Sequence, residues 1–270
     1  MGWLANVSVL VALPAYALIF AATAVLGHSL FRRCVPPERL REQYDVAGFL
    51  VSVVGVLYSV VLGFLVGTVW TAFSAAQDTT NLEAGYVADA FNFAKQVPEP
   101  QRTELENILA RYAYEVRDIE PPMLGMRRED AHAIALMNRA VRITVTMPAP
   151  KTRNPGEILE SNMLRTALMG NLRNVGDQRR LRMLQAQSRL PPGMYEALLL
   201  GAALVIAFAF FFGIQNYFKQ MAMTALVAAS IGLFFGLIVE LSTPYSGSIQ
   251  VSRDAWTLII DNNHMAAFLK

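Results

Sequence analysis

The chain has 270 residues, of which 54% are hydrophobic and only 16% charged, and its mean hydropathy is +0.35. Of its 23 basic and 21 acidic residues, 31 lie between Asp78 and Glu196, so long uncharged runs flank a polar middle. This distribution excludes an ordinary soluble domain and predicts an integral membrane protein. A net charge of +2 without a basic cluster indicates no nucleic-acid partner, and the single Cys34 excludes an internal disulfide and a cysteine-based zinc site.

Four apolar segments are long enough to cross a bilayer as helices, which requires about 20 residues. They lie at about residues 3–27, 47–76, 195–217 and 220–241. The first segment lacks a basic start and its apolar run is longer than that of a signal peptide, so we expect a retained span. The expected organisation is a first transmembrane hairpin (1–77), a helical extramembrane domain (78–192), a second hairpin (193–243) and a C-terminal tail with a short helix (244–270).

The middle region and the tail also have the pattern of helices. Apolar residues recur at helical spacing in the middle, as in Leu105, Leu109 and Tyr112, and no strand-like alternation of any length occurs. The predicted fold class is therefore all-α. No proline interrupts the chain between the second span and Pro98, so we expect one long helix to leave the membrane. The tail helix after Ser252 could lie at the membrane interface or pack on the middle domain, and we favour packing.

Two spans carry rows of small residues at four-residue intervals. The row in the second span consists of Gly55, Ser59, Gly63, Gly67 and Thr71, and the row in the fourth span includes Gly232 and Gly236. Residues four apart lie nearly above one another on a helix, and small ones let helices approach closely in lipid. The rows therefore indicate either packing within one subunit or a subunit interface or pore wall. Because four helices are too few to enclose a pore, the second interpretation requires a homo-oligomer.

Two acidic residues lie where these helices reach the end of their apolar runs. Asp78 follows the second span, and Glu240 continues the small-residue row of the fourth. A ring of carboxylates at a pore mouth attracts cations, so both are candidates for a pore rim. The alternative is a carboxylate that reaches the membrane interface without further function.

The sequence contains no recognisable catalytic or metal-binding motif. His28, His132 and His264 are isolated, and there is no phosphate-binding loop, dinucleotide fingerprint or zinc-binding HExxH pattern. We therefore expect neither an enzyme nor a cofactor or metal site.

Basic residues in short loops predict which side of the membrane each segment occupies. The short first loop holds Arg32, Arg33, Arg39 and Arg41, which favours the cytoplasm for that loop. Arginines of the long middle region are discounted, since the rule holds for short loops. The expected protein is a multi-pass protein of the cell (inner) membrane, with both termini and the middle domain outside the cytoplasm.

Several motifs match a known pattern from about residue 45 onward. They are Ala47-Gly48-Phe49, Gly55-Val56-Leu57-Tyr58-Ser59, Leu62-Gly63-Phe64, Val69-Trp70, Glu83-Ala84, Pro98-Glu99-Pro100, Pro191-Pro192 and Pro244-Tyr245-Ser246-Gly247. The pattern resembles the bestrophin-like family of bacterial and plant membrane proteins. The resemblance implies an oligomeric anion channel with two spans, a helical region and two more spans. It also implies a cytosolic middle region, which conflicts with the arginine count. No bestrophin aromatic gate or calcium clasp can be placed on this sequence, so chloride selectivity does not follow.

Two functions are consistent with these patterns. The first is a homo-oligomeric ion channel whose second span lines or flanks the pore. Its partners would be the lipid bilayer, further copies of the chain and inorganic ions. The alternative is a membrane-anchored scaffold or sensor whose helical middle domain binds a partner.

Overall fold

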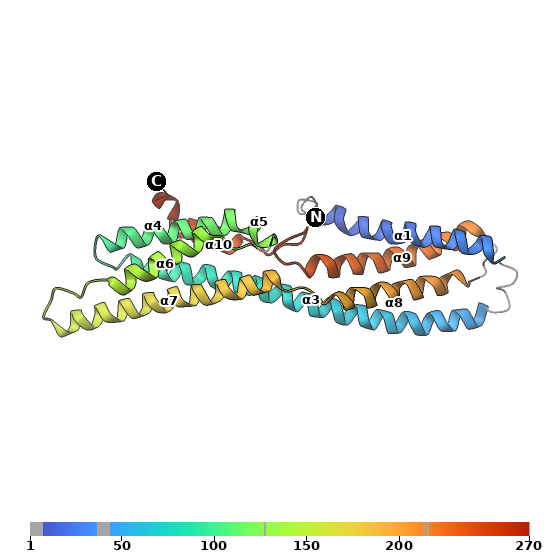
Figure 1. Cartoon of the computed structure of the whole chain (residues 1–270), viewed down its shortest axis with the longest axis horizontal. Coiled ribbons are helices and arrows are strands. Elements are labelled where there is room, and N and C mark those ends of the chain that lie inside the picture. Colours follow the sequence, from blue (N-terminus) through green and yellow to red (C-terminus); the bar gives the residue numbers. More distant parts are fainter. Residues whose placement is uncertain (1–7, 37–43, 127, 213, 215, 270) are drawn as a thin grey trace. The chain divides into compact units, whose positions relative to one another are not determined.

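The structure, a computed structural model, describes residues 8–36, 44–126, 128–212, 214 and 216–269. The expected start of the first span at residue 3, and Arg39 and Arg41 of the charge count, lie outside these residues. The helices are α1 (Val9–Cys34), α3 (Tyr44–Ala94), α4 (Gln101–Tyr114), the π-helical segment η3 (Glu115–Ile119), α5 (Glu120–Gly125), α6 (Ala131–Thr146), α7 (Pro155–Gln187), α8 (Pro192–Phe210), α9 (Tyr217–Leu241), α10 (Asp254–Asn262) and the 3₁₀ segment η4 (Met265–Phe268) (Figure 1). The described residues include no strand, so the predicted all-α class is confirmed.

Four of these helices are long and apolar enough to cross a membrane, namely α1, α3, α8 and α9. Two helix ends differ from the expected spans. α1 continues to Cys34, and α8 ends at Phe210 rather than near residue 217. The side chain of Asn216 accepts a hydrogen bond from the Lys219 amide at 3.1 Å, which fixes the start of α9. Apolar character alone did not reveal this break, because the residues before Asn216 are themselves mostly apolar.

The contacts divide the chain into two compact units. The first unit comprises residues 1–73, 189–243 and 247–249, and the second comprises 74–188, 244–246 and 250–270. The helix α3 is continuous over 51 residues and contributes to both, which confirms the predicted long helix. The grouping of the spans into two hairpins, and the placement of residues 78–192 outside the membrane, stay predictions.

In the first unit, α1 runs alongside α9, and the first part of α3 lies next to α8 (Figure 1). The buried core contains residues from α3, α8 and α9. It consists of Tyr58, Leu62, Leu65, Val69, Leu198, Ala202, Val205, Ile231, Phe235, Ile238 and Leu241. One face of α3 is therefore covered within the protomer.

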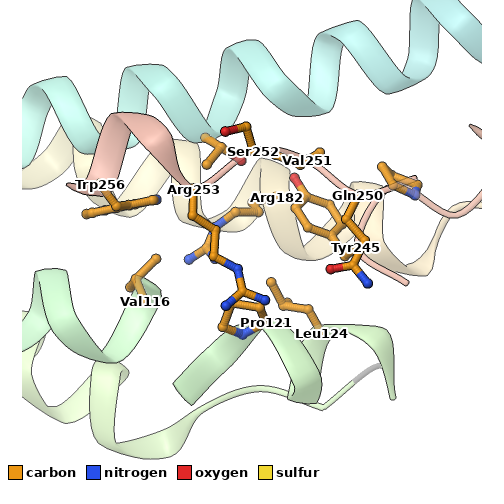
Figure 2. A pocket seen from close by; sticks show the side chains of 12 residues that line it. Val116, Pro121, Leu124, Arg182, Tyr245, Gln250, Val251, Ser252, Arg253 and Trp256 are labelled. Carbon is orange, nitrogen blue, oxygen red and sulfur yellow. The ribbon is translucent and has the colours of Figure 1, made fainter. Parts of the chain in front are cut away.

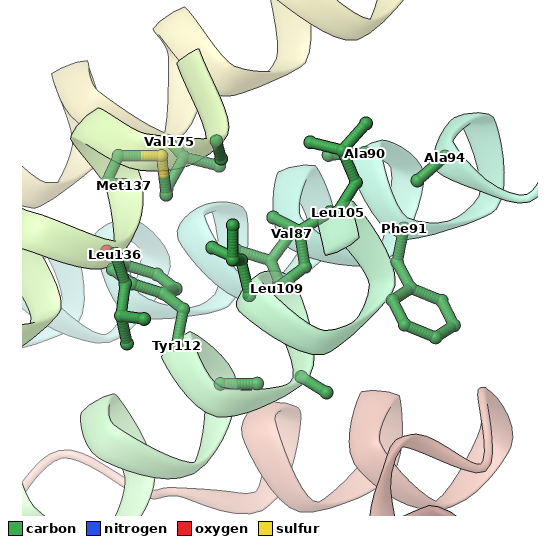
Figure 3. Close-up of a cluster of buried hydrophobic side chains, with 14 of the residues drawn as sticks. Val87, Ala90, Phe91, Ala94, Leu105, Leu109, Tyr112, Leu136, Met137 and Val175 are labelled. Carbon is green, nitrogen blue, oxygen red and sulfur yellow. The ribbon is translucent and has the colours of Figure 1, made fainter. Parts of the chain in front are cut away.

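In the second unit, α4, α6 and α7 pack with the last part of α3 around an apolar core (Figure 3). The C-terminal residues Trp256, Ile259, Ile260 and Met265 belong to this same core. The indole of Trp256 meets the ring of Tyr112 edge to face, with the ring centroids 6.3 Å apart. The prediction that the tail helix packs on the middle region is thus confirmed.

A π-helical segment joins α4 to α5. The amide of Glu120 donates to the carbonyl of Glu115, five residues back, just before Pro121 and Pro122. A proline has no amide hydrogen and its ring clashes with the carbonyl four residues earlier, so a widened turn accommodates the pair. The widened turn absorbs one residue. Tyr112 and Glu120 then lie within about 20° of each other around the axis, instead of about 80° in a regular helix.

Candidate functional site: an open row on α3 and a buried charge network

The small-residue row of α9 is filled from within the protomer. Gly232 and Gly236 are buried against α1. A Cβ added to Gly232 would lie 2.7 Å from the backbone oxygen of Tyr16, and one added to Gly236 would lie 2.5 Å from its ring. No side chain fits at either position without displacing α1. Of the two interpretations left open by the sequence, helix packing within one subunit holds for this row.

The row of α3 is open. A Cβ added to Gly55, Gly63 or Gly67 would meet no atom within 4 Å. Ser59 and Thr71 of the same row are exposed, and each hydroxyl bonds a carbonyl of its own helix, at 2.8 and 2.9 Å. The buried face of α3, which carries Tyr58, Leu62, Leu65 and Val69, points elsewhere. This row is therefore available for something outside the described protomer.

A further glycine, which the sequence did not single out, sets the distance between α3 and α8. A Cβ on Gly201 would lie 2.6 Å from the ring of Tyr58, whose hydroxyl donates to the carbonyl of Leu198 at 3.1 Å. Tyr58 thereby links α3 to α8, and the open row of α3 faces away from this contact.

The two acidic rim candidates lie in different surroundings. Glu240 is buried, and its Oε2 accepts hydrogen bonds from the amide of Ser248 at 2.7 Å and from its hydroxyl at 3.0 Å. Gly247 has a φ of +95°, and a Cβ there would lie 2.7 Å from the same oxygen, so the turn requires glycine. Glu240 thus anchors the loop after α9. Asp78 is exposed on α3, and its role at a pore rim stays a prediction.

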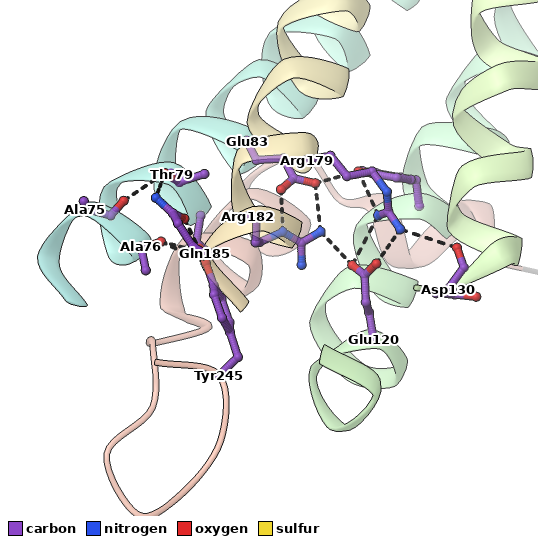
Figure 4. Close-up of polar contacts among 12 residues, drawn as sticks. Ala75, Ala76, Thr79, Glu83, Glu120, Asp130, Arg179, Arg182, Gln185 and Tyr245 are labelled. Atoms are coloured by element: carbon purple, nitrogen blue, oxygen red, sulfur yellow. Dashed lines mark hydrogen bonds and ion pairs between the residues drawn. The ribbon is translucent and has the colours of Figure 1, made fainter. Parts of the chain in front are cut away.

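A network of buried charges occupies the second unit (Figure 4). Arg182 donates to Glu83 through Nε at 2.7 Å and to Glu120 through Nη2 at 2.6 Å. Arg179 forms a second ion pair with Glu120, and its Nη1 donates to Glu120 Oε2 at 3.2 Å. The hydroxyl of Tyr112 donates to Glu83 at 2.6 Å. Two carboxylates and two guanidinium groups balance each other, which is the condition for burying charge at tolerable cost.

The protonation of this network follows from its burial. Burial, followed by the adjacent Glu83 carboxylate, raises the pKa of Tyr112 well above its ordinary value, so the phenol remains a donor. Burial alone would lower the pKa of Arg182, but Glu83 and Glu120 outweigh it and the net shift is upward. Tyr112 therefore stays a neutral hydrogen-bond donor and Arg182 stays charged across physiological pH.

Sequence reasoning missed this network, although a signal was present. On α7 the buried residues Leu168, Leu172 and Val175 form a helical row, and Arg179 and Arg182 continue it at the same spacing. Arginines in the register of an apolar row are not solvated charges. Their true partners, Glu83 and Glu120, lie 99 and 62 residues from Arg182 along the chain.

The fold and these sites define a class of protein: a multi-pass helical membrane protein whose second helical unit contains a buried charge network. A model of the bestrophin-like domain matches residues 18–256. The chain therefore belongs to the bestrophin-like family, as the motif resemblance indicated. A search of curated proteins finds no match.

Solved structures support the same fold. A crystal structure of a bacterial bestrophin homologue from Klebsiella pneumoniae aligns with a TM-score of 0.62 at 10% identity, covering 95% of this chain and 97% of that one. A variant of that homologue aligns with a TM-score of 0.63 at 10% identity, covering 96% and 100%. A crystal structure described as a membrane protein gives a TM-score of 0.64 at 10% identity, covering 95% and 97%.

Proposed function

We propose that the chain forms a homo-oligomeric membrane ion channel in which α3 lines or flanks the pore. The observation that carries this proposal is the contrast between the two rows of small residues. The row of α9 is filled by α1, whereas the row of α3 meets nothing at Gly55, Gly63 and Gly67. Membership of the bestrophin-like family supports a channel rather than an enzyme, since the family resemblance implies channels.

The open row of small residues on α3 has a physical explanation if further copies of the chain pack against it. In lipid, apolar burial does not drive association, so contacts depend on close approach between helix backbones. A row of glycines on α3 provides such an approach around a symmetry axis. The hydroxyls of Ser59 and Thr71 are already bonded to backbone carbonyls, so they can face either water or a neighbouring helix.

The polar features outside the row fit this arrangement. The second unit would form the extramembrane part, because charged residues concentrate there. Asp78, exposed on α3 beyond the row, is the remaining rim candidate, since Glu240 is engaged by Ser248. Reversal potentials in asymmetric KCl, with and without Asp78→Asn, would show which ion passes and whether this carboxylate contributes.

The test is reconstitution of the purified protein in planar bilayers. Single-channel steps are expected, and Gly63→Leu should reduce current or oligomer content at least tenfold, because leucine fills the groove. Val61→Leu is the matched control: Val61 is half exposed on the opposite side of α3, so assembly and current should persist.

Other results would contradict the proposal. If the protein is a stable monomer in detergent and shows no conductance at any pH or calcium concentration, the channel proposal is contradicted. The membrane-anchored scaffold is then favoured. If Gly63→Leu and Val61→Leu behave equally in both assays, the small-residue row of α3 takes no part in assembly or conduction.

A further inference from the structure

An apolar groove lies in the first unit between α1 and α8, and its volume is about 400 Å³. This volume is within the range of sites that bind organic ligands. By comparison, a cavity in the second unit that Arg182, Tyr245 and Trp256 help to line (Figure 2) measures about 30 Å³ and has room for little more than water. Both helices that form the groove are long and apolar enough to cross a membrane, so the groove opens to lipid.

The lining of the groove suits an extended hydrocarbon chain. Ala24 and Ala202 lie deep in it, each 2% exposed, whereas Ile19 and Leu199 border it at 61% and 47% exposure. Its one polar lining residue among those described is Thr23, whose hydroxyl donates to the carbonyl of Ile19 at 2.8 Å. In lipid, a second helix approaches closely where small residues are at the surface. Here bulky side chains border the small ones, which leaves room for a chain of methylene groups rather than for a helix.

One end of the groove lies where α1 and α8 end and α9 begins. The ring of Phe210 lies 3.2 Å from the position of a Cβ on Gly27, and both residues line the groove. The carbonyl of Phe210 accepts a hydrogen bond from Nε2 of Gln220 at 3.4 Å, which places the start of α9 at this end. Arg33, in the last turn of α1, and Lys219, in the first turn of α9, are both exposed. This end of the groove is therefore flanked by basic side chains.

Acidic residues do not cancel this charge. There is none on α1, and those of α8 and α9, Glu196 and Glu240, lie at the opposite ends of these helices. In the sequence, residues 32–45 contain four arginines and three acidic residues, so with Lys219 this end remains basic. Basic residues at the ends of membrane-spanning helices attract anionic lipid head groups.

A buried histidine lies at the same end. The ring of His28 meets that of Phe210 edge to face, with the ring centroids 5.3 Å apart. His28 is 1% exposed, and neither of its ring nitrogens has a hydrogen-bond partner among the described residues. A buried polar group without a partner is costly. The basic end of the groove thus also contains a hydrogen-bonding group that lacks a partner.

We propose that the groove between α1 and α8 binds one acyl chain of an anionic phospholipid, with the phosphate of its head group at Arg33 and Lys219. The ester group that joins this chain to the head group then lies at the Phe210 end, and its carbonyl oxygen is the acceptor that His28 lacks. The site is independent of the proposed pore, since none of the row on α3 from Gly55 to Thr71 lines it.

The experiment measures thermal unfolding of the full-length protein in detergent, with added phosphatidylglycerol or with phosphatidylcholine that has the same acyl chains. Phosphatidylglycerol is expected to raise Tm saturably by about 2–4 °C, because a ligand of the folded state stabilises it. Ala203→Trp fills the groove and should abolish the shift. Leu200→Trp is the matched control, since Leu200 is 67% exposed on the same helix and does not line the groove.

The head group is tested with Arg33→Gln/Lys219→Gln. Phosphatidylcholine has no net charge, so it should raise Tm by less than half as much as phosphatidylglycerol in the parent protein. In the double variant the two lipids should have equal effects. Equal effects of the two lipids on the parent protein would overturn the proposal.

Native mass spectrometry provides a second measurement. The parent and Leu200→Trp should each retain one phosphatidylglycerol per chain, and Ala203→Trp none. Ala207→Leu, which fills the groove with a smaller side chain, replaces Ala203→Trp if that variant does not fold. An undiminished Tm shift and lipid retention in the groove-filling variant would overturn the proposal, because the lipid would then bind elsewhere. Loss of oligomers with retention of the lipid would also overturn it, and would assign the groove to a contact between copies.

Discussion

At the scale of single residues, burial decides what a charge does in this protein. Arg182 and Arg179 come from a polar region, yet both are buried and paired with Glu83 and Glu120. A buried ion pair contributes little net stability compared with apolar packing, but removing one partner leaves a charge without compensation. The network therefore specifies how α3, α5 and α7 meet, rather than adding a large stabilisation.

This asymmetry gives a direct prediction for Arg182→Met. The variant leaves Glu83 and Glu120 with Arg179 as their remaining cationic partner, so the free energy of unfolding should fall by about 3–5 kcal/mol. Chemical denaturation in detergent measures the change. Arg173→Met, at an exposed position of α7, should stay within about 0.5 kcal/mol of the parent. Equal stability of the two variants would show that Arg182 does not balance the buried charges of Glu83 and Glu120.

Tyr245 predicts a dependence of stability on pH. Burial raises its pKa to about 12, and its hydroxyl donates to the carbonyl of Ala76 at 3.3 Å. The folded state therefore holds this proton more tightly than the unfolded state. The contribution is complete below about pH 10 and is lost as the pH rises toward 12, with a slope of about 1.4 kcal/mol per unit. Tyr245→Phe should reduce the slope of the stability profile in that range by about this amount, while the contribution of Tyr112 remains, and an unchanged slope would contradict the assignment.

At the scale of secondary-structure elements, two helices with the same spacing of small residues have different surroundings. On α9 the row receives Tyr16 and Phe20 of α1, whereas on α3 the row faces away from the protomer core. The four-residue period was visible in the sequence in both cases. Which row is filled depends on whether another helix lies against it, and no local pattern encodes that.

The filled row predicts a cost for the smallest possible side chain. Gly236→Ala places a methyl group 2.5 Å from the ring of Tyr16, so α1 must shift and stability should fall by about 1–3 kcal/mol. Thermal unfolding in detergent is the measurement. Gly170→Ala on α7, where a Cβ meets nothing within 4 Å, should instead gain up to about 1 kcal/mol through helix propensity. A neutral Gly236→Ala would mean that α1 is not held against α9.

At the scale of the whole molecule, the chain is a multi-pass membrane protein of the bestrophin-like family with two compact units. The C-terminal tail belongs to the second unit, because Trp256 and Ile260 are buried in its core. Orientation is the property on which the arginine count and the family resemblance disagree, and it determines which compartment the second unit contacts.

Cys34 offers a test of orientation without any substitution. It is the one cysteine of the chain and is exposed at the end of α1. The arginine count predicts that this end is cytoplasmic. A membrane-impermeant maleimide should therefore label Cys34 in lysed cells but not in intact cells. Labelling of intact cells would reverse the orientation and place the second unit in the cytoplasm, as the family resemblance implies.

The sequence by itself determined that the chain is a membrane protein, that its fold is helical and roughly where its spans lie. Uninterrupted apolar runs and helical periodicity are local properties, so they can be read without the tertiary structure. It also indicated the family and the long α3. It did not determine where α8 ends, since the break depends on the cap at Asn216 amid apolar neighbours. Tertiary structure alone decided that Glu240 anchors a loop, that Arg182 meets Glu83 and Glu120, and that the row on α3 is open while that on α9 is filled. These depend on contacts between residues far apart in the chain, and such contacts leave no periodic signal within either segment.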